Sequence, residues 1–444
     1  MTAIKVSDHF TLGRLLRFCA PTAAMMIFTS IYGVVDGLFV SNFVGKESFS
    51  ALNLIYPLLM MLGALGFMFG TGGTALVAKT MGEGDAPRAR GLFSLIIYVT
   101  LGVGIACGIV CLLIVRPVGI AFGAQGSLLE ECVVYGSILS FSLPFFMLQQ
   151  AFQSFLAAAG KPKVGLCVVV CAGVANIVLD AVFIVGLGWG IAGAAAATAA
   201  SEFLGGGIPL IYFACRNKST LRLGRPVMDA RALGRACVNG SSELVSNISM
   251  SLVSMLYNWQ LMAYVGPDGV AVYGVIQYAA WVFASLFMGY AVGASPLISY
   301  NYGAKNTPEL RGLFKKSLLV MGVGGIVVMV AMEVLARPLS GIFVGYDAQL
   351  LEMTVSALRE YSLAFVFVGM SVFGSAFFTA LNNGLVSALI SFLRTLVFEC
   401  AAVLLLPLAF GTDGIWFAIV VAEAASFMLT TGFLVGLRKQ YGYA

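Results

Sequence analysis

Residues 70–93, GTGGTALVAKTMGEGDAPRARGLF, have a counterpart 221 positions later in residues 291–314, AVGASPLISYNYGAKNTPELRGLF. Eight positions are identical at this offset, where chance would give about one or two, and such self-similarity indicates an internal duplication. Outward from this stretch, the same offset pairs Gly45 with Gly266 and Arg116-Pro117 with Arg337-Pro338. The chain is therefore expected to contain two homologous halves.

Within the repeated stretches, a pair of identical glycines lies just beyond the expected spans 52–78 and 271–298. These glycines are Gly82 and Gly303, and we expect them to permit tight turns at equivalent positions of the two halves.

The composition predicts that both halves lie in a membrane. Of the 444 residues, 60% are hydrophobic and 10% are charged, and the mean hydropathy is +0.97. A soluble domain carries about 25% charged residues. The apolar runs are long and continuous rather than alternating, so helices are the expected spanning structure. Twelve such runs lie near 18–43, 52–78, 92–115, 133–157, 164–187, 190–214, 236–264, 271–298, 314–336, 355–380, 386–409 and 414–436.

The basic residues predict the orientation of these spans. With the N-terminus inside, 20 of the 25 Lys and Arg residues fall in cytoplasmic segments and only three fall in outside loops. This is the positive-inside pattern. It predicts a multi-pass protein of the plasma membrane with both termini cytoplasmic. In a cell with two membranes, this is the inner membrane. The repeat spans six helices, an even number, so the halves enter the membrane in the same direction.

The sequence thus predicts an all-α polytopic protein with twelve transmembrane helices in two pseudo-symmetric lobes. We expect an N-lobe at 1–215 with helices 1–6, a basic cytoplasmic linker at 216–235, and a C-lobe at 236–444 with helices 7–12.

Polar residues inside the first six spans are candidates for a functional site, because a carboxylate at the bilayer centre costs about 2.5–3.5 kcal/mol. Asp36 lies in the first span and Asp180 in the fifth, and Asn176 shares a helix face with Asp180. Thr198 in the sixth span could add a hydroxyl. Such oxygen ligands suit a hard cation or a proton relay, while interhelical hydrogen bonding is the structural alternative.

The fourth span adds the amides Gln150 and Gln153 as candidates for a cation shell. The second half has its own set, in which Arg394 could neutralise a carboxylate, so a buried structural ion pair is an open alternative to a coupling site. Its members are Glu243, Arg394, Glu399 and Glu423.

The chain resembles the multidrug and toxic compound extrusion (MATE) family over nearly its whole length. The motifs that carry the resemblance include YGVVDGLFVSNFVG around Asp36, the GTGGTALVAKTMGEGD segment, NIVLD, GWGIAGAAAAT and YNYGAKN, and their order is more specific than any one of them. It is most similar to the bacterial branch with an Asp on helix 1 and Asn-x-x-x-Asp on helix 5.

The resemblance implies a cation-coupled antiporter that exports amphipathic, often cationic drugs by alternating access. It implies an H⁺ or Na⁺ site at Asp36, Asn176, Asp180 and Thr198, and a bend of helix 1 at Pro21. The chain departs from the family pattern on helix 4, where Gln150 and Gln153 replace the more frequent Asn. Glu243 matches the helix-7 acid of other branches and is a secondary candidate.

Other functions have less support in the residues. A related lipid-linked oligosaccharide flippase would need a cationic cavity, and a membrane-embedded enzyme would need a catalytic motif such as HExxH or GxSxG. An ATP-driven pump would need a phosphate-binding loop, which is absent. Nine scattered Cys and one His predict no cofactor and no metal beyond Na⁺. We expect small molecules and lipid as partners, no nucleic acid, no enzymatic activity, and a monomer.

Overall fold

The computed structural model describes residues 6–122, 124–216, 219–345 and 347–443, and helices dominate them. The first six long helices are α1 (Leu12–Phe39), α2 (Lys46–Gly82), α3 (Ala86–Ala121), α4 (Gly126–Ala158), α5 (Pro162–Asp180) and α6 (Gly190–Ala214). The next are α7 (Ala230–Tyr264), α8 (Pro267–Gly303), α9 (Thr307–Val344), α10 (Ala348–Ser362), α11 (Phe365–Ala380), α12 (Gly384–Phe392), α13 (Glu399–Gly436) and the short α14 (Arg438–Tyr441). Three short π-helical segments continue α1, α5 and α12, namely η1 (Val40–Val44), η2 (Ala181–Gly186) and η3 (Leu393–Phe398).

Within the described residues, nine helical segments are long and apolar enough to cross a membrane, and a tenth is α10 with α11, bent by 48°. One of the nine, Gly384–Gly436, has 53 residues. A straight helix of that length would measure about 80 Å, more than twice the hydrocarbon core. It contains a non-helical residue at Gly411, so it supplies two crossings. With the more polar α7, the fold has the twelve transmembrane helices that the sequence predicts.

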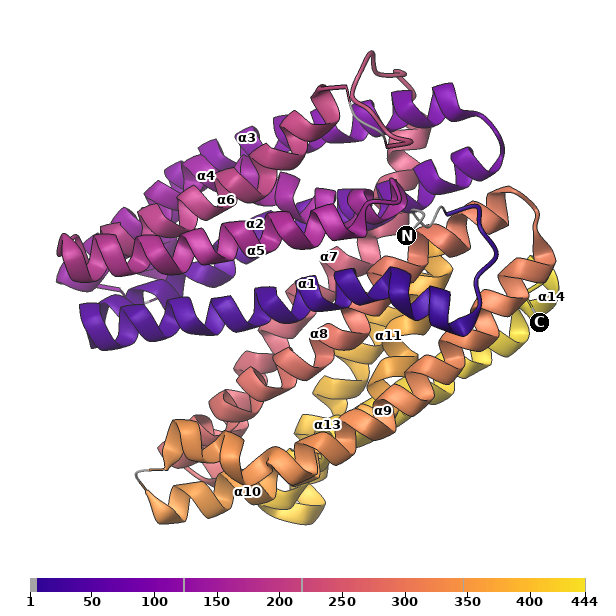
Figure 1. Cartoon of the computed structure of the whole chain (residues 1–444). Coiled ribbons are helices and arrows are strands. Elements are labelled where there is room, and N and C mark those ends of the chain that lie inside the picture. The colour runs from indigo at the N-terminus through magenta and orange to yellow at the C-terminus, as the bar shows by residue number, and fades with distance from the viewer. Residues whose placement is uncertain (1–5, 123, 217–218, 346, 444) are drawn as a thin grey trace.

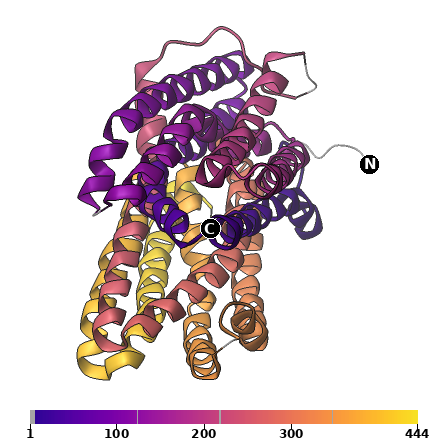
Figure 2. The same ribbon diagram turned by 90° about the vertical axis from the view of Figure 1, so that its left-hand side faces the viewer.

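The helices form two groups that meet at one end and diverge toward the other (Figure 1). The N-lobe consists of α1 to α6, and the C-lobe of α7 to α14. Figure 2, viewed from the diverging end, shows the N-lobe above the C-lobe, with the indigo helices of the first 80 or so residues at the seam. The segment just before α1, the helix α14, the linker between α6 and α7, and the α2–α3 and α8–α9 turns all lie at the end where the lobes meet.

The first helix of each lobe begins against the other lobe. Phe10, Leu15 and Phe18 are buried in the C-lobe core, whereas Ala232 and Ala236 at the start of α7 belong to an N-lobe core cluster. The lobes are thus joined reciprocally at the end where they meet.

Glycines make this junction possible, because the backbones of the two lobes touch there. A Cβ atom on Gly82 would overlap the carbonyl oxygen of Tyr300, and one on Gly303 would overlap that of Lys79. These two contacts are images of each other at the 221-residue offset. Tight turns directly follow α2 and α8 after Gly82 and Gly303, as expected, but these glycines are not the residues whose conformation permits the turns. They are the last helical residues, and the positive φ angles belong to Gly84 and Lys305.

The duplication extends into the segments that follow each lobe. The Nε atom of Arg90 donates to the carbonyl of Thr220 at 3.1 Å, and that of Arg311 donates to the carbonyl of Gly442 at 3.0 Å. The linker is shorter than expected from the sequence, since α7 begins at Ala230 with the Asp229 carboxylate as its N-cap. We use "linker" below for residues 215–229.

Candidate functional site

The N-lobe site is built where α1 packs closely on α5. Gly173 creates the close approach: a Cβ atom there would lie 2.5 Å from Phe28 and 2.9 Å from Tyr32. Asn176 and Asp180 follow Gly173 at helical spacings of three and seven residues, so they occupy the same face of α5. Asp36 lies one turn beyond Tyr32 on α1. The missing side chain at Gly173 therefore brings Asp36 opposite the polar face of α5.

Asp36 interacts with three polar side chains of the lobe: Asp180, Asn176 and Thr198. Asp180 is fully buried and Asn176 is 1% exposed. Despite this proximity, Oδ1 of Asp36, Oδ1 of Asn176, both carboxyl oxygens of Asp180 and Oγ1 of Thr198 are buried without a hydrogen-bond partner. Buried oxygens of this kind are costly unless a proton or a cation satisfies them.

Two neighbours of this cluster are not among the cation-coupling residues predicted from the sequence. Glu202 on α6 lies near Asp36 and beside Ser142, and Tyr32 lies beside Gln149. Helical spacing could have indicated both residues, because Tyr32 precedes Asp36 by four residues and Glu202 follows Thr198 by four.

The candidate amides of α4 are placed differently from the Asp36 cluster. Gln150 and Gln153 are buried, but no interaction within the described residues joins either of them to Asp36 or Asp180, and Nε2 of Gln153 has no partner. Gln149 is the glutamine of α4 that approaches this region, through Tyr32 and through its packing against Gly205.

In the C-lobe, the three candidate carboxylates lie around the fourth candidate, Arg394. Nε and a terminal nitrogen of Arg394 both lie 2.8 Å from Oε1 of Glu423, whose side chain is 4% exposed. Glu399 and Glu243 also lie within electrostatic range of the Arg394 guanidinium. Unlike the N-lobe cluster, this one contains a permanent cation.

The other sequence-predicted feature, Pro21, lies inside α1, which continues through it as a helix. Within the described residues there is no group of three or more His, Cys, Asp or Glu that could hold a metal ion. The N-lobe cluster instead combines two carboxylates with an amide and a hydroxyl, a donor set that suits Na⁺ or a shared proton.

Twelve membrane-crossing helices in two repeated lobes, with polar groups buried inside each lobe, define a polytopic membrane protein of the transporter class. The sequence profile of the MatE family matches residues 21–182 and 244–403. The chain therefore belongs to the MatE family. The profile matches once in each lobe, and the two matches end 221 residues apart, which is the offset of the internal repeat.

Relatives and solved structures agree with this assignment. The multidrug export protein MepA of Staphylococcus aureus strain MRSA252 is 24% identical over 418 residues, covering 92% of this chain and 90% of MepA. The fold is similar to the crystal structure of MATE in the straight conformation, with TM-score 0.90, 22% identity and coverage of 96% of this chain and 95% of that one. It is also similar to an outward-facing multidrug resistance MATE family transporter of the MOP superfamily, with TM-score 0.90, 22% identity and coverage of 96% and 95%.

Proposed function

We propose that this protein exports amphipathic, often cationic drugs from the cytoplasm in exchange for H⁺ or Na⁺ by alternating access. The observation that carries the proposal is the N-lobe cluster, in which the carboxylates of Asp36 and Asp180 lie beside Asn176 and Thr198 with buried oxygens that have no donor. The names of relatives such as MepA, a multidrug export protein, support the drug as the exported species.

A cation bound at this cluster has a physical reason to favour one arrangement of the lobes. Two carboxylates on neighbouring helices repel each other, and a proton or Na⁺ between them removes that repulsion. The α1 helix carries Asp36, and its opposite end packs against α8 of the C-lobe, where Gly293 approaches Thr22. A change at Asp36 can therefore reach the seam through one helix. Cation and drug act through their different affinities for the two arrangements.

The orientation is part of the proposal. With the basic segments in the cytoplasm, the lobes meet at the cytoplasmic end and diverge toward the outside, an arrangement that supports an outward-open state. We propose a location in the cytoplasmic membrane with both termini inside, and a role as a transporter rather than an enzyme. Ser219→Cys in a background without the native cysteines should resist an impermeant thiol reagent in intact cells. Efficient labelling at this position would show that the orientation is the opposite of the one proposed.

The available driving force is sufficient. One proton moving through about 100 mV gains roughly 2.3 kcal/mol. A tenfold proton ratio adds about 1.4 kcal/mol. For a neutral drug exchanged one for one with H⁺, these together support a drug gradient of several hundredfold. For a monocationic drug the moved charges cancel, and the proton ratio alone supports a gradient of about tenfold per proton.

The direct test is uptake of a fluorescent cationic dye into inverted membrane vesicles. A pH gradient and a Na⁺ gradient are imposed separately, and ATP added together with a protonophore and a Na⁺ ionophore serves as the control. We expect one of the two gradients to drive accumulation and ATP to drive none. Accumulation under neither gradient would contradict cation-coupled antiport.

A further inference from the structure

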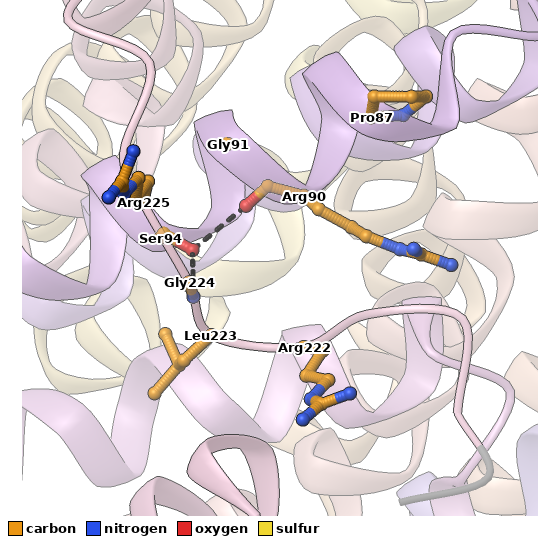
Figure 3. Close-up of a pocket in the computed structure, with 8 residues that line it drawn as sticks. All are labelled: Pro87, Arg90, Gly91, Ser94, Arg222, Leu223, Gly224 and Arg225. Atoms are coloured by element: carbon orange, nitrogen blue, oxygen red, sulfur yellow. Dashed lines mark hydrogen bonds between the residues drawn. The ribbon is translucent and has the colours of Figure 1, made fainter. Parts of the chain in front are cut away.

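A pocket of about 290 Å³ lies outside both lobe interiors, where the linker passes along the start of α3 (Figure 3). Its lining residues are Pro87, Arg90, Gly91, Ser94, Arg222, Leu223, Gly224 and Arg225. We propose that this pocket binds the phosphate headgroup of an anionic phospholipid at the cytoplasmic surface of the membrane.

The charge of the pocket is positive and is not neutralised by the protein. Arg90, Arg222 and Arg225 form no ion pair within the described residues. The carboxylates close to them have other partners: Asp229 pairs with Arg88 at 3.1 Å and caps α7, and Asp85 caps α3. The three arginines line the same pocket, although their side chains extend in different directions in Figure 3. Each carries an uncompensated guanidinium group, and guanidinium donors match the oxygens of a phosphate.

The pocket has fixed walls. The Oγ atom of Ser94 donates to the carbonyl of Arg90 at 2.9 Å and accepts from the N–H of Gly224 at 3.0 Å, as the dashed lines in Figure 3 show. The hydroxyl of Tyr98 donates to the carbonyl of Gly224 at 3.2 Å, and the Nε atom of Arg90 donates to the carbonyl of Thr220 at 3.1 Å. The linker is therefore attached to α3 on both sides of the pocket, and the arginines extend from an ordered backbone.

An apolar stripe on α3 leads from the pocket into the membrane. Tyr98, Ile105, Ile109 and Leu113 share one helix face and are 43%, 50%, 55% and 73% exposed. A tyrosine at the level of the headgroups with apolar residues beyond it is typical of a lipid-facing helix. Phosphate-binding arginines at one end and an apolar face along the helix match the two parts of a phospholipid. This continuity favours a lipid over a free phosphate ion.

The C-lobe provides a matched control for the site. Arg311 is the repeat equivalent of Arg90 and makes the same kind of Nε–carbonyl hydrogen bond, to Gly442. After Gly442 the chain continues into Tyr443, which is fully buried against Phe314 and Phe377. Replacing Arg311 thus removes one arginine and one hydrogen bond at the same end of the molecule, outside the proposed lipid site.

The test compares lipid binding by the full-length protein in detergent with native mass spectrometry. Dioleoyl phosphatidylglycerol is the probe, and dioleoyl phosphatidylcholine and inorganic phosphate are the two comparison ligands. We expect phosphatidylglycerol to bind more tightly than phosphatidylcholine. Arg90→Gln, and separately Arg222→Gln combined with Arg225→Gln, should weaken phosphatidylglycerol binding by at least fivefold. Arg311→Gln, the counterpart of Arg90→Gln, should leave it within twofold of wild type.

A photoactivatable phosphatidylglycerol gives a second measurement on the unmodified protein, independent of how the variants fold. We expect its crosslinks on peptides that contain residues 87–98 or 222–227. Unchanged lipid binding by the double variant, or crosslinks only elsewhere, would overturn the proposal. Saturable binding of inorganic phosphate that displaces phosphatidylglycerol would also overturn it, since the ligand would then be a soluble phosphate. Neither measurement depends on transport.

Discussion

The two lobes share one ancestry of sequence and fold but differ in how they hold buried charge. In the C-lobe, Arg394 contacts Glu423 at 2.8 Å and provides a resident cation. In the N-lobe, the charged residues near Asp36 are Asp180 and Glu202, which are both acidic. A cluster with its own cation can be stable at a fixed charge, whereas a cluster of acids needs a proton or cation from outside. The difference supports the coupling role proposed for the N-lobe cluster and favours a structural role for the C-lobe cluster.

The largest effect is expected from removing the N-lobe charges. Asp36→Asn and Asp180→Asn each keep the size of the side chain but remove its titratable group. Each should reduce gradient-driven dye uptake in inverted vesicles to the level of vesicles without the protein. The double variant should be little worse than either single variant, because the two carboxylates act as a unit.

Glu243→Gln is the matched change in the C-lobe and should have a milder effect on the same uptake assay. Thermal unfolding in detergent should show that all of these variants are folded. The comparison between the lobes would fail if the two aspartate variants pumped normally while Glu243→Gln was inactive.

The next effect concerns stability rather than transport. Arg394→Met leaves Glu423 buried without its partner and should cost about 3 kcal/mol of unfolding free energy. Replacing both residues with Met should recover most of that loss, since an apolar pair of similar size needs no neutralisation. Thermal unfolding measures both. If the double variant were folded as stably as wild type but inactive in transport, the pair would have a role in coupling.

A smaller effect is expected at the glycines that join the lobes. A Cβ atom on Gly82 or Gly303 meets a backbone oxygen of the other lobe. Alanine at either position should therefore destabilise the contact at the end where the lobes meet by about 1–3 kcal/mol. Spin labels on Arg88 and Lys315 should then report longer distances between the lobes. Gly102→Ala is the control, since nothing lies within 4 Å of a Cβ atom there. Equal distance distributions in all variants would show that these contacts do not hold the lobes together.

The smallest effect is expected from substitutions of the glutamines of α4, and it should differ between them. Gln149→Leu removes the side-chain partner of Tyr32. We expect the loss of this interaction to cost about 1 kcal/mol, which corresponds to a transport rate lower by roughly fivefold. Gln150→Leu and Gln153→Leu should change the rate less, because neither is among the side-chain partners of Asp36 and Asp180 in the described structure. A larger loss in either of these two variants would place the cation path further along α4.

The sequence was sufficient for the membrane class, the twelve spans and the repeat, because hydropathy and a constant offset are visible without coordinates. It was less informative about how side chains meet. The approach of Asp36 to Asp180 depends on Gly173, and nothing in the local pattern distinguishes this glycine from the others in the spans. Gly82 and Gly303 were recognised as equivalent, but their role across the seam depends on tertiary packing.

The amides of α4 show the same limit. Three glutamines lie within five residues, and burial alone does not indicate which of them approaches a site on other helices. Gln149 packs against Gly205 of α6, and only the arrangement of α4 and α6 reveals that contact. The pocket beside Arg222 and Arg225 likewise requires the path of the linker across α3, which charge counting did not predict.

The reciprocal contacts of Gly82 with Tyr300 and of Gly303 with Lys79 have the form of an isologous interface, in which one patch is used twice. In a symmetric dimer of a single six-helix chain, every substitution in that patch would occur in both copies, and so would every change of buried charge. When the two copies are joined in one chain, each can be substituted independently of the other. One lobe can then acquire an arginine such as Arg394 while its twin keeps its acids, so a symmetric scaffold can support an asymmetric division of labour.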